Sequence, residues 1–494
     1  MEKFYITTAI PYVNSKPHLG HTLEFVQADV IARYKRISGR EVFLTTGADE
    51  NSLKNVQAAE KLGISTEDLC RQNSELFKQL AEKIGLSFSQ FVRSSDKDFH
   101  WPGIEKLWNA CAANGDIYKK KYKGLYCVGC EAFYTEDELV DGKCPEHLTR
   151  PELVEEENYF FALSRYQQKL MELIESNELA IYPESRKNEV LSFVRRGLED
   201  FSISRSSARA KDWGVPVPND PSQKIYVWFD ALGVYLTGVG FGRDQEQFDK
   251  WWPADIHIIG KGIIRFHAVY WPAMLISAGL KLPEKIFVHD YVVVEGQKMS
   301  KSLGNVVDPI GLIDRYSRDA LRYFLVAENP TWKDTNFSEK SLVARINGEL
   351  MADLSNLVAR VLTIAGKVDP SGIDGKDELS SHLNLKKIKE DIDTFDLYGA
   401  VNELWAFIRR VNKYVNDKKP WELKGEELNN ALYNALESIR VIAILLQPFM
   451  PDTADKIFSQ LGIEPQGLDS VNFDRFTGTP KRGENLFGKV DAKA

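Results

Sequence analysis

The chain has 494 residues, a net charge of -8, 43% hydrophobic residues and 27% charged residues. This length suggests about three domains, and the composition is that of an ordinary soluble globular protein. The acidic balance argues against a protein that coats nucleic acid non-specifically, and the apolar runs are too short to span a membrane. The N-terminus has no signal or transit pattern, so we expect a cytoplasmic protein.

The first hundred residues alternate between strand-like and helix-like patterns. Residues 3–8, Lys-Phe-Tyr-Ile-Thr-Thr, have the pattern of a buried strand, and the apolar spacing from about 20 to 38 is helical. A second predicted strand, 41–46, and a second predicted helix, 51–62, follow. This alternation indicates an α/β fold with a doubly wound, Rossmann-type parallel sheet.

The alternation stops near residue 118 and resumes about a hundred residues later. The intervening segment holds a lysine-rich run and a cysteine knuckle, so we expect an insertion that splits the sheet. Further strands are predicted at 224–229, 255–259 and 285–289, and the pattern is helical from about 342 onward. The predicted parts are a first half-sheet (1–117), the insertion (118–223), a second half-sheet (224–290), a loop-bearing region (291–341), an all-α bundle (342–470) and a tail (471–494).

A histidine motif follows the first predicted strand, where His18 and His21 flank Gly20. Ligands of doubly wound sheets bind at the carboxyl ends of the strands, and the N-terminus of the next helix attracts anions. Two imidazoles and a glycine at this place suit a phosphate. The alternative is a pair of surface histidines at the start of a helix.

A lysine motif follows the last predicted strands, where Lys298 and Lys301 enclose Met299 and Ser300. A flexible cationic loop of this kind suits the charge that grows on a leaving pyrophosphate. Taken alone, the same run would be read as a solvated basic turn.

In this order, the two motifs resemble the signatures of class I aminoacyl-tRNA synthetases, and the similarity covers nearly the whole chain. The resemblance implies that ATP, carrying Mg²⁺, is bound by His18, Gly20, His21, Lys298, Ser300 and Lys301. The histidines would stabilise the transition state at the α-phosphate, and the lysines would hold the pyrophosphate. The resulting aminoacyl-adenylate would then pass its acyl group to the terminal ribose of a tRNA.

The segments 8–12, 226–232 and 257–261 resemble those of methionyl-tRNA synthetases. The resemblance implies L-methionine and tRNA(Met), including the initiator, as substrates. Asp49 would hold the amino group, and the side chain would lie among Ile10, Tyr12, Trp228, Ala231, Leu232, Tyr235, Ile263 and His267. Aromatic walls with a few donors suit a thioether, although such aromatics are often only core. Asn51 and Gly262 depart from the residues usual in the family, which are His and Asp.

Four residues in the insertion have the spacing of metal ligands: Cys127, Cys130, Cys144 and His147. Two knuckles of this kind supply the four nitrogen and sulfur ligands of a closed tetrahedral zinc site. We therefore expect one structural Zn²⁺, against the alternative of buried free thiols.

The helical half resembles an anticodon-binding bundle. Asn356 and Arg360 lie on one helical face, and Trp421 offers a stacking platform within a basic stretch. By resemblance these three residues would bind the CAU anticodon, although each is also explained as an ordinary structural residue. The chain lacks the added domain with which many relatives dimerise, so we expect a monomer.

Three alternatives remain open. A small-molecule nucleotidyltransferase shares the histidine motif but has no helical RNA-binding half. A non-catalytic tRNA-binding paralogue would not need the lysine motif. Among class I enzymes, the cysteine enzyme is the nearest competitor, because the isoleucine, valine and leucine enzymes carry an editing domain larger than the insertion available here.

Overall fold

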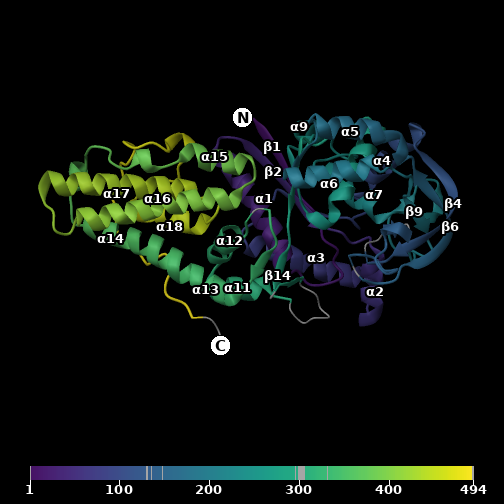
Figure 1. Cartoon of the computed structure of the whole chain (residues 1–494), viewed down its shortest axis with the longest axis horizontal. Helices are drawn as coiled ribbons and strands as arrows, with labels where there is room; N and C mark the ends of the chain where they lie inside the picture. Colours follow the sequence, from purple (N-terminus) through teal and green to yellow (C-terminus); the bar gives the residue numbers. More distant parts are fainter. Residues whose placement is uncertain are drawn as a thin grey trace.

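The computed structural model describes residues 2–129, 132–134, 136–146, 148–294, 296–298, 306–330 and 332–491. Figure 1 shows a helical bundle at one end, a parallel sheet in the middle and the inserted segment at the other end. Within these ranges, no helix is long and apolar enough to cross a membrane.

The central sheet has six parallel strands in the order β3-β2-β1-β12-β13-β7. Its strands are β1 (Lys3–Thr8), β2 (Glu41–Ala48), β3 (Gln90–Arg93), β7 (Ala180–Tyr182), β12 (Ile256–Gly260) and β13 (Lys285–His289). The connecting helices include α1 (Leu19–Ile37), α2 (Leu53–Leu62), α3 (Thr66–Lys83), α4 (Trp101–Ala113) and α10 (Trp271–Ser277). The expected doubly wound α/β fold is confirmed, and β1 is buried from Phe4 to Thr8 because it lies between β2 and β12.

The inserted segment is built on a four-stranded antiparallel sheet, β5-β4-β6-β8. Its strands are β4 (Ile117–Cys127), β5 (Ala132–Tyr134), β6 (Glu152–Phe161) and β8 (Phe201–Ser202). The lysine-rich run lies on β4, where Lys121 faces Glu157 and Lys123 faces Glu155 across the ladder. Opposite charges on paired strands explain why this run forms a strand and not a loop.

The strand pairing differs from the predicted division at two places. β7 lies within the stretch assigned to the insertion, yet it pairs with β13 at the edge of the main sheet. The strand predicted at 224–229 is wrong. β11 (Asp220–Ile225) belongs to a small antiparallel sheet with β9 (Ser204–Ser206) and β10 (Pro216–Val217), and the apolar run after it forms helix α7 (Val227–Leu232). A short continuous apolar run fits a buried helix as well as a buried strand.

Short elements lie on both sides of the sheet. On the side away from the bundle, a second core includes residues of α5 (Gln167–Glu175), α6 (Glu184–Arg195), α8 (Val234–Thr237) and α9 (Gln245–Trp251). The elements that follow β13 and lead into the bundle are β14 (Val292–Val294), β15 (Gln297–Lys298), α11 (Pro309–Tyr316), α12 (Arg318–Ala327) and β16 (Thr335–Phe337). β14 follows β13 directly, but it pairs with β15 and β16 and not with the main sheet.

The C-terminal part is helical, as predicted. It comprises α13 (Glu339–Arg345), a π-helical segment (Ile346–Ser355), α14 (Asn356–Ala365), α15 (Leu385–Asp393), α16 (Leu397–Lys418), α17 (Gly425–Leu446) and α18 (Pro451–Leu461). The apolar residues of α16 at the predicted helical spacing, Leu404, Ile408, Val411 and Val415, are all buried. One core runs from α1 through α12 into this bundle.

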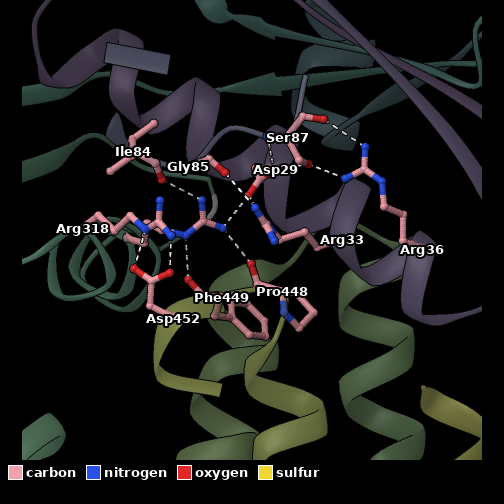
Figure 2. Close-up of polar contacts among 11 residues, drawn as sticks. Asp29, Arg33, Arg36, Ile84, Gly85, Ser87, Arg318, Pro448, Phe449 and Asp452 are labelled. Atoms are coloured by element: carbon pink, nitrogen blue, oxygen red, sulfur yellow. Dashed lines mark hydrogen bonds and ion pairs between the residues drawn. The ribbon is translucent and has the colours of Figure 1, made fainter. Parts of the chain in front are cut away.

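A buried ion pair joins the sheet to the bundle (Figure 2). The Arg322 guanidinium on α12 lies 2.7 Å from the Asp29 carboxylate on α1, and both side chains are fully buried. Arg322 also donates to the carbonyl oxygens of Pro448 and Phe449, each at 2.9 Å, in the turn between α17 and α18. A buried charge pair with satisfied donors holds its partners in one geometry, because breaking it strands a charge.

Candidate active site and RNA-facing pocket

The histidine motif forms the first turn of α1, at the carboxyl edge of the sheet. His18 caps the helix, and its Nδ1 accepts from the Gly20 backbone N–H at 3.1 Å. The His21 Nδ1 accepts from the His18 N–H at 3.2 Å, and the two rings stack with centroids 3.9 Å apart. Because both Nδ1 atoms accept, the proton of each neutral ring lies on Nε2, which can donate to a ligand.

His21 is held in its neutral form. Burial lowers its pKa well below 6.5, and the neighbouring His18 and His289 lower it further. Gly20 leaves room for the His18 ring, which would have to shift if a Cβ were added at this position, 2.9 Å from the ring. The motif is therefore a pair of neutral N–H donors at a helix N-terminus, an arrangement suited to an anion.

Sequence reasoning missed a second buried pair beneath this motif, Glu24 and His289. His289 Nδ1 donates to the Asp290 carbonyl at 2.8 Å, and Nε2 lies 2.9 Å from the Glu24 carboxylate. Burial raises the pKa of Glu24. The two groups form a buried hydrogen-bonded pair next to the histidine motif, and only their distance in sequence concealed the pairing.

The residues expected around the methionine side chain largely converge on one place. Trp228, Ala231 and Leu232 lie on α7, Tyr235 on α8, and His267 on the π-turn before α10, and all are buried. Tyr12 and Trp228 meet edge to face, with ring centroids 6.2 Å apart. Ile10 and Ile263 lie in the segments after β1 and β12 and are half-buried.

His267 has a defined tautomer. Its Nδ1 donates to the Ile263 carbonyl at 3.0 Å, so its Nε2 accepts from the Tyr235 hydroxyl at 2.8 Å. Burial lowers the pKa of His267 to about 4, which keeps the ring neutral. Sequence reasoning missed Phe266, whose ring stacks on Trp228 at 3.8 Å. The Trp228 Nε1 is buried and, among the described residues, has no hydrogen-bond partner.

Asp49 lies at the end of β2 beside Asn51, one of the two departures from the family pattern. The Asn51 side-chain amide donates to the Asp230 carboxylate at 2.7 Å and to the Ser94 carbonyl at 2.9 Å. His100 donates to the same Asp230 carboxylate at 2.9 Å. Asn51 thus fills its position as a donor that orients a buried carboxylate. The signal for Asp230 was a charged residue inside an apolar run.

The second departure, Gly262, has a steric reason. A Cβ at this position would lie 2.3 Å from the Tyr291 hydroxyl, so the tyrosine occupies the space of a side chain at 262. The adjacent Lys261 makes ion pairs with Asp290 at 3.0 Å and Asp334 at 2.6 Å, which ties the end of β12 to the segments that flank β14 and β16.

The lysine motif is placed only in part. Gln297 and Lys298 form β15, which pairs with β14. Ser300 and Lys301 lie outside the described residues, as does the Lys298 side chain.

Two of the four expected metal ligands are described. Cys127 and Cys144 are buried, and both contact Thr149: Cys127 Sγ lies 3.9 Å from its hydroxyl, and the Cys144 N–H donates to its carbonyl at 2.9 Å. Cys130 and His147 lie outside the described residues, within which no group of three potential ligands is found. Two buried thiols, one from each knuckle and both in contact with Thr149, fit a soft divalent metal such as Zn²⁺.

The three expected anticodon residues line one cavity of about 700 Å³ on the bundle. Asn356 and Arg360 come from α14, and Trp421 follows α16 with 51% of its surface exposed. Arg360 donates to Asn412 at 2.9 Å and to Asn416 at 2.7 Å, two residues that sequence reasoning missed. They repeat at i, i+4 on α16, but nothing in the sequence shows which face of α16 meets α14.

Comparisons with known proteins place the chain in a family. Residues 4–150 and 147–362 match the model of "tRNA synthetases class I (M)", and residues 380–481 match that of the "Anticodon-binding domain of tRNA ligase". The methionine–tRNA ligase of Caldanaerobacter subterraneus is 43% identical, over 99% of this chain and 79% of the relative. The chain belongs to the methionine–tRNA ligases. The ligase of Thermotoga maritima is 42% identical, over 99% of this chain and 81% of the relative.

Solved structures of this family have the same fold. Mycobacterium tuberculosis methionyl-tRNA synthetase in complex with methionyl-adenylate superposes with a TM-score of 0.93 and 41% identity, covering 99% of this chain and 100% of that one. Membership of the methionine–tRNA ligases excludes the nucleotidyltransferase and the cysteine enzyme that the sequence left open.

Proposed function

We propose that the chain activates L-methionine with ATP to methionyl-adenylate and then transfers the methionyl group to the 3′ end of tRNA(Met), including the initiator. The observation that carries this proposal is the buried cluster of Trp228, Tyr235 and His267 together with the neutral His18–His21 pair, in a chain 41% identical to a structure bound to methionyl-adenylate.

In the first step, a carboxylate oxygen of methionine attacks the α-phosphorus of ATP, and the bond to the β-phosphate oxygen breaks. The Nε2–H groups of His18 and His21 would donate to the α-phosphate as its charge grows, while Lys298, Ser300 and Lys301 hold the leaving pyrophosphate. Asp49 would bind the ammonium group of methionine. Mg²⁺ bound to ATP would neutralise phosphate charge.

In the second step, a ribose hydroxyl of the tRNA attacks the methionyl carbonyl, and AMP leaves. Asn356, Arg360 and Trp421 would bind the anticodon at the other end of the molecule. The exposed face of Trp421 can stack on a base, and the amide-held Arg360 guanidinium can donate to a base edge or phosphate.

The assay that tests the function is ATP–pyrophosphate exchange with each of the twenty amino acids and with norleucine. Methionine should give the strongest signal. Norleucine should be weaker by about 1–3 kcal/mol, since an apolar pocket discriminates poorly between near-isosteres. Stronger exchange with another amino acid would refute the methionine assignment, and no exchange with any would favour a non-catalytic tRNA-binding paralogue.

Cys127, Cys130, Cys144 and His147 would hold one structural Zn²⁺, which would stabilise the insertion because its binding energy is folding energy. Elemental analysis should find one zinc per chain. Cys144→Ser should lose it, while the matched change of a buried cysteine elsewhere, Cys111→Ser, should keep it. A zinc content of zero or two in the unaltered protein would contradict the single site.

We also infer that the protein is a cytoplasmic monomer. Its chain divides into the six parts predicted from the sequence, except that β7, within the predicted insertion, pairs with the main sheet. Sedimentation of the free protein tests the monomer. A concentration-dependent dimer would contradict it.

A further inference from the structure

A continuous row of polar contacts leads from the Arg360 cavity towards the catalytic part. Asn412, which accepts from Arg360, donates its own amide to the Asp353 carbonyl at 2.7 Å. Arg409 bridges the carboxylates of Asp353 and Glu349, each at 3.1 Å. Glu349 in turn accepts from the Tyr323 hydroxyl on α12 at 2.6 Å. Every link is a direct contact between described residues.

The two carboxylates of this row lie in the π-helical segment Ile346–Ser355. π-Helical turns are energetically poorer than α-helix and are found mostly where a function requires them. α14 begins at the next residue, Asn356. A shift in this segment would therefore move Asn356 and Arg360 together. Arg345, which directly precedes the π-helical segment, forms ion pairs with both Glu349 and Glu328 and so stabilises the position of the segment.

At its other end the row meets the joint of Figure 2. Tyr323 is the neighbour of Arg322 on α12, and its ring packs on Trp405 of α16 at 4.3 Å. Arg322 reaches Asp29 on α1. Asp29 lies eight residues, or about two helical turns, beyond His21 on the same helix. One helix pair thus connects the π-helical segment to the histidine motif.

We propose that Glu349, held by Tyr323 and Arg409, is a positioning residue that couples occupancy of the anticodon cavity to charging of the tRNA acceptor end. The inference rests on the proposed function. Glu349 touches neither predicted ligand, so its effect is on the geometry of α14 relative to α12 and α1.

Spatial continuity alone does not establish coupling, so the test is a double-mutant cycle. Tyr323→Phe removes only the hydroxyl that Glu349 accepts and leaves the ring on Trp405. The matched control is Tyr316→Phe, because the Tyr316 hydroxyl donates to Glu339 at 2.5 Å in an arrangement of the same kind outside the row. Each change is combined with Trp421→Ala, and kcat/KM for charging of full-length tRNA and methionine-dependent exchange are measured.

Trp421→Ala should lower charging about five- to a hundredfold in the unaltered chain. In the Tyr323→Phe background the same change should cost at least about fivefold less, as expected for coupled sites. In the Tyr316→Phe background it should cost the same as in the unaltered chain. Exchange should be unchanged in Tyr323→Phe and in Tyr316→Phe.

Additive effects of Tyr323→Phe and Trp421→Ala, within about twofold, would overturn the proposal. So would an equal loss of exchange and charging in Tyr323→Phe, because that result marks a purely structural residue. Glu349→Gln, which keeps the side-chain size, repeats the cycle at the centre of the row. If methionine supports no exchange even in the unaltered chain, the proposed function fails, and the coupling experiment is not what decides it.

Discussion

The two candidate recognition sites of this chain differ in the burial and polarity of the residues that form them. At the sheet edge, His21, His257 and His267 have lowered pKa values, chiefly because they are buried, and aromatic rings surround them. In the bundle, amides and arginines line an open cavity beside a half-exposed Trp421. A small apolar ligand is selected by shape and a few fixed neutral donors, whereas a large polyanion is met by charge and an exposed stacking surface.

Both sites contain a buried donor without a hydrogen-bond partner among the described residues. At the sheet edge this donor is the Trp228 Nε1, and in the bundle it is the Arg360 Nε. The two sites differ in what surrounds the donor, because the Trp228 ring stacks on Phe266, whereas the other two nitrogens of Arg360 donate to Asn412 and Asn416. Ring packing therefore holds the Trp228 indole, and neighbouring amides hold the Arg360 guanidinium.

The largest expected effect comes from the sheet-edge site. His21→Ala should slow adenylate formation about 10²–10³-fold, because it removes a donor to the phosphate in the transition state. Pyrophosphate exchange measures the rate of adenylate formation. The fluorescence of Trp228 follows methionine binding, and the affinity for methionine should change little. The matched change of an exposed histidine, His382→Ala, should leave exchange intact. A loss below about threefold for His21→Ala would place the histidine outside the chemistry.

Acid should weaken the sheet-edge site before the bundle. His267 has a folded-state pKa of about 4 against 6.5 for the ordinary group, so the unfolded chain takes up its proton first as the pH falls. The contribution of His267 to the free energy of unfolding is therefore fully present above pH 6.5. It falls by roughly 3 kcal/mol as the pH is lowered from 6.5 to 4. Denaturant unfolding of the unaltered chain and of His267→Gln over this range isolates the contribution. Parallel pH profiles for the two proteins would show that His267 is not held neutral.

Trp421→Ala tests the bundle alone. Charging of tRNA should fall by about 1–3 kcal/mol in transition-state free energy, since one base loses its stacking surface, and exchange should stay unchanged. Trp421→Phe keeps an aromatic face and should lose less. Equal damage to exchange and charging would mean that the tryptophan supports the fold, and the division into two recognition sites would lose its basis.

The smallest effect concerns the departure at 262. Gly262→Ala should destabilise the chain by about 1 kcal/mol, because the new methyl overlaps the Tyr291 hydroxyl. Tyr291→Phe removes that hydroxyl and leaves the nearest ring atom at an ordinary 3.6 Å, so the double variant should regain the loss. Thermal unfolding measures both. No rescue in the double variant would assign the cost to the glycine backbone.

Local sequence patterns predicted the regular elements whose burial is visible in the spacing of their own residues. β1 has the predicted bounds, and α1 begins and ends within one residue of the prediction. The run after 225 was mistaken for a strand because its apolar residues carry no period that separates a buried helix from a buried strand. Pairings across the fold, such as Glu24 with His289 or Arg360 with Asn412, depend on how elements pack and leave no local trace. The histidine and lysine motifs were found because their residues lie within a few positions of one another in the sequence.

The strand order has a consequence for the way the chain is made. Ile6 of β1 pairs with Ile256 of β12. One edge of β1 therefore has no partner until β12 has been synthesised, about 250 residues later. At about 5–20 residues per second, the ribosome needs roughly ten seconds or more to supply it. During that time one edge of a strand that is buried in the folded protein has no partner, and an unpaired strand edge is the condition that favours association between nascent chains. We expect the growing N-terminal half to depend on chaperones until β12 emerges.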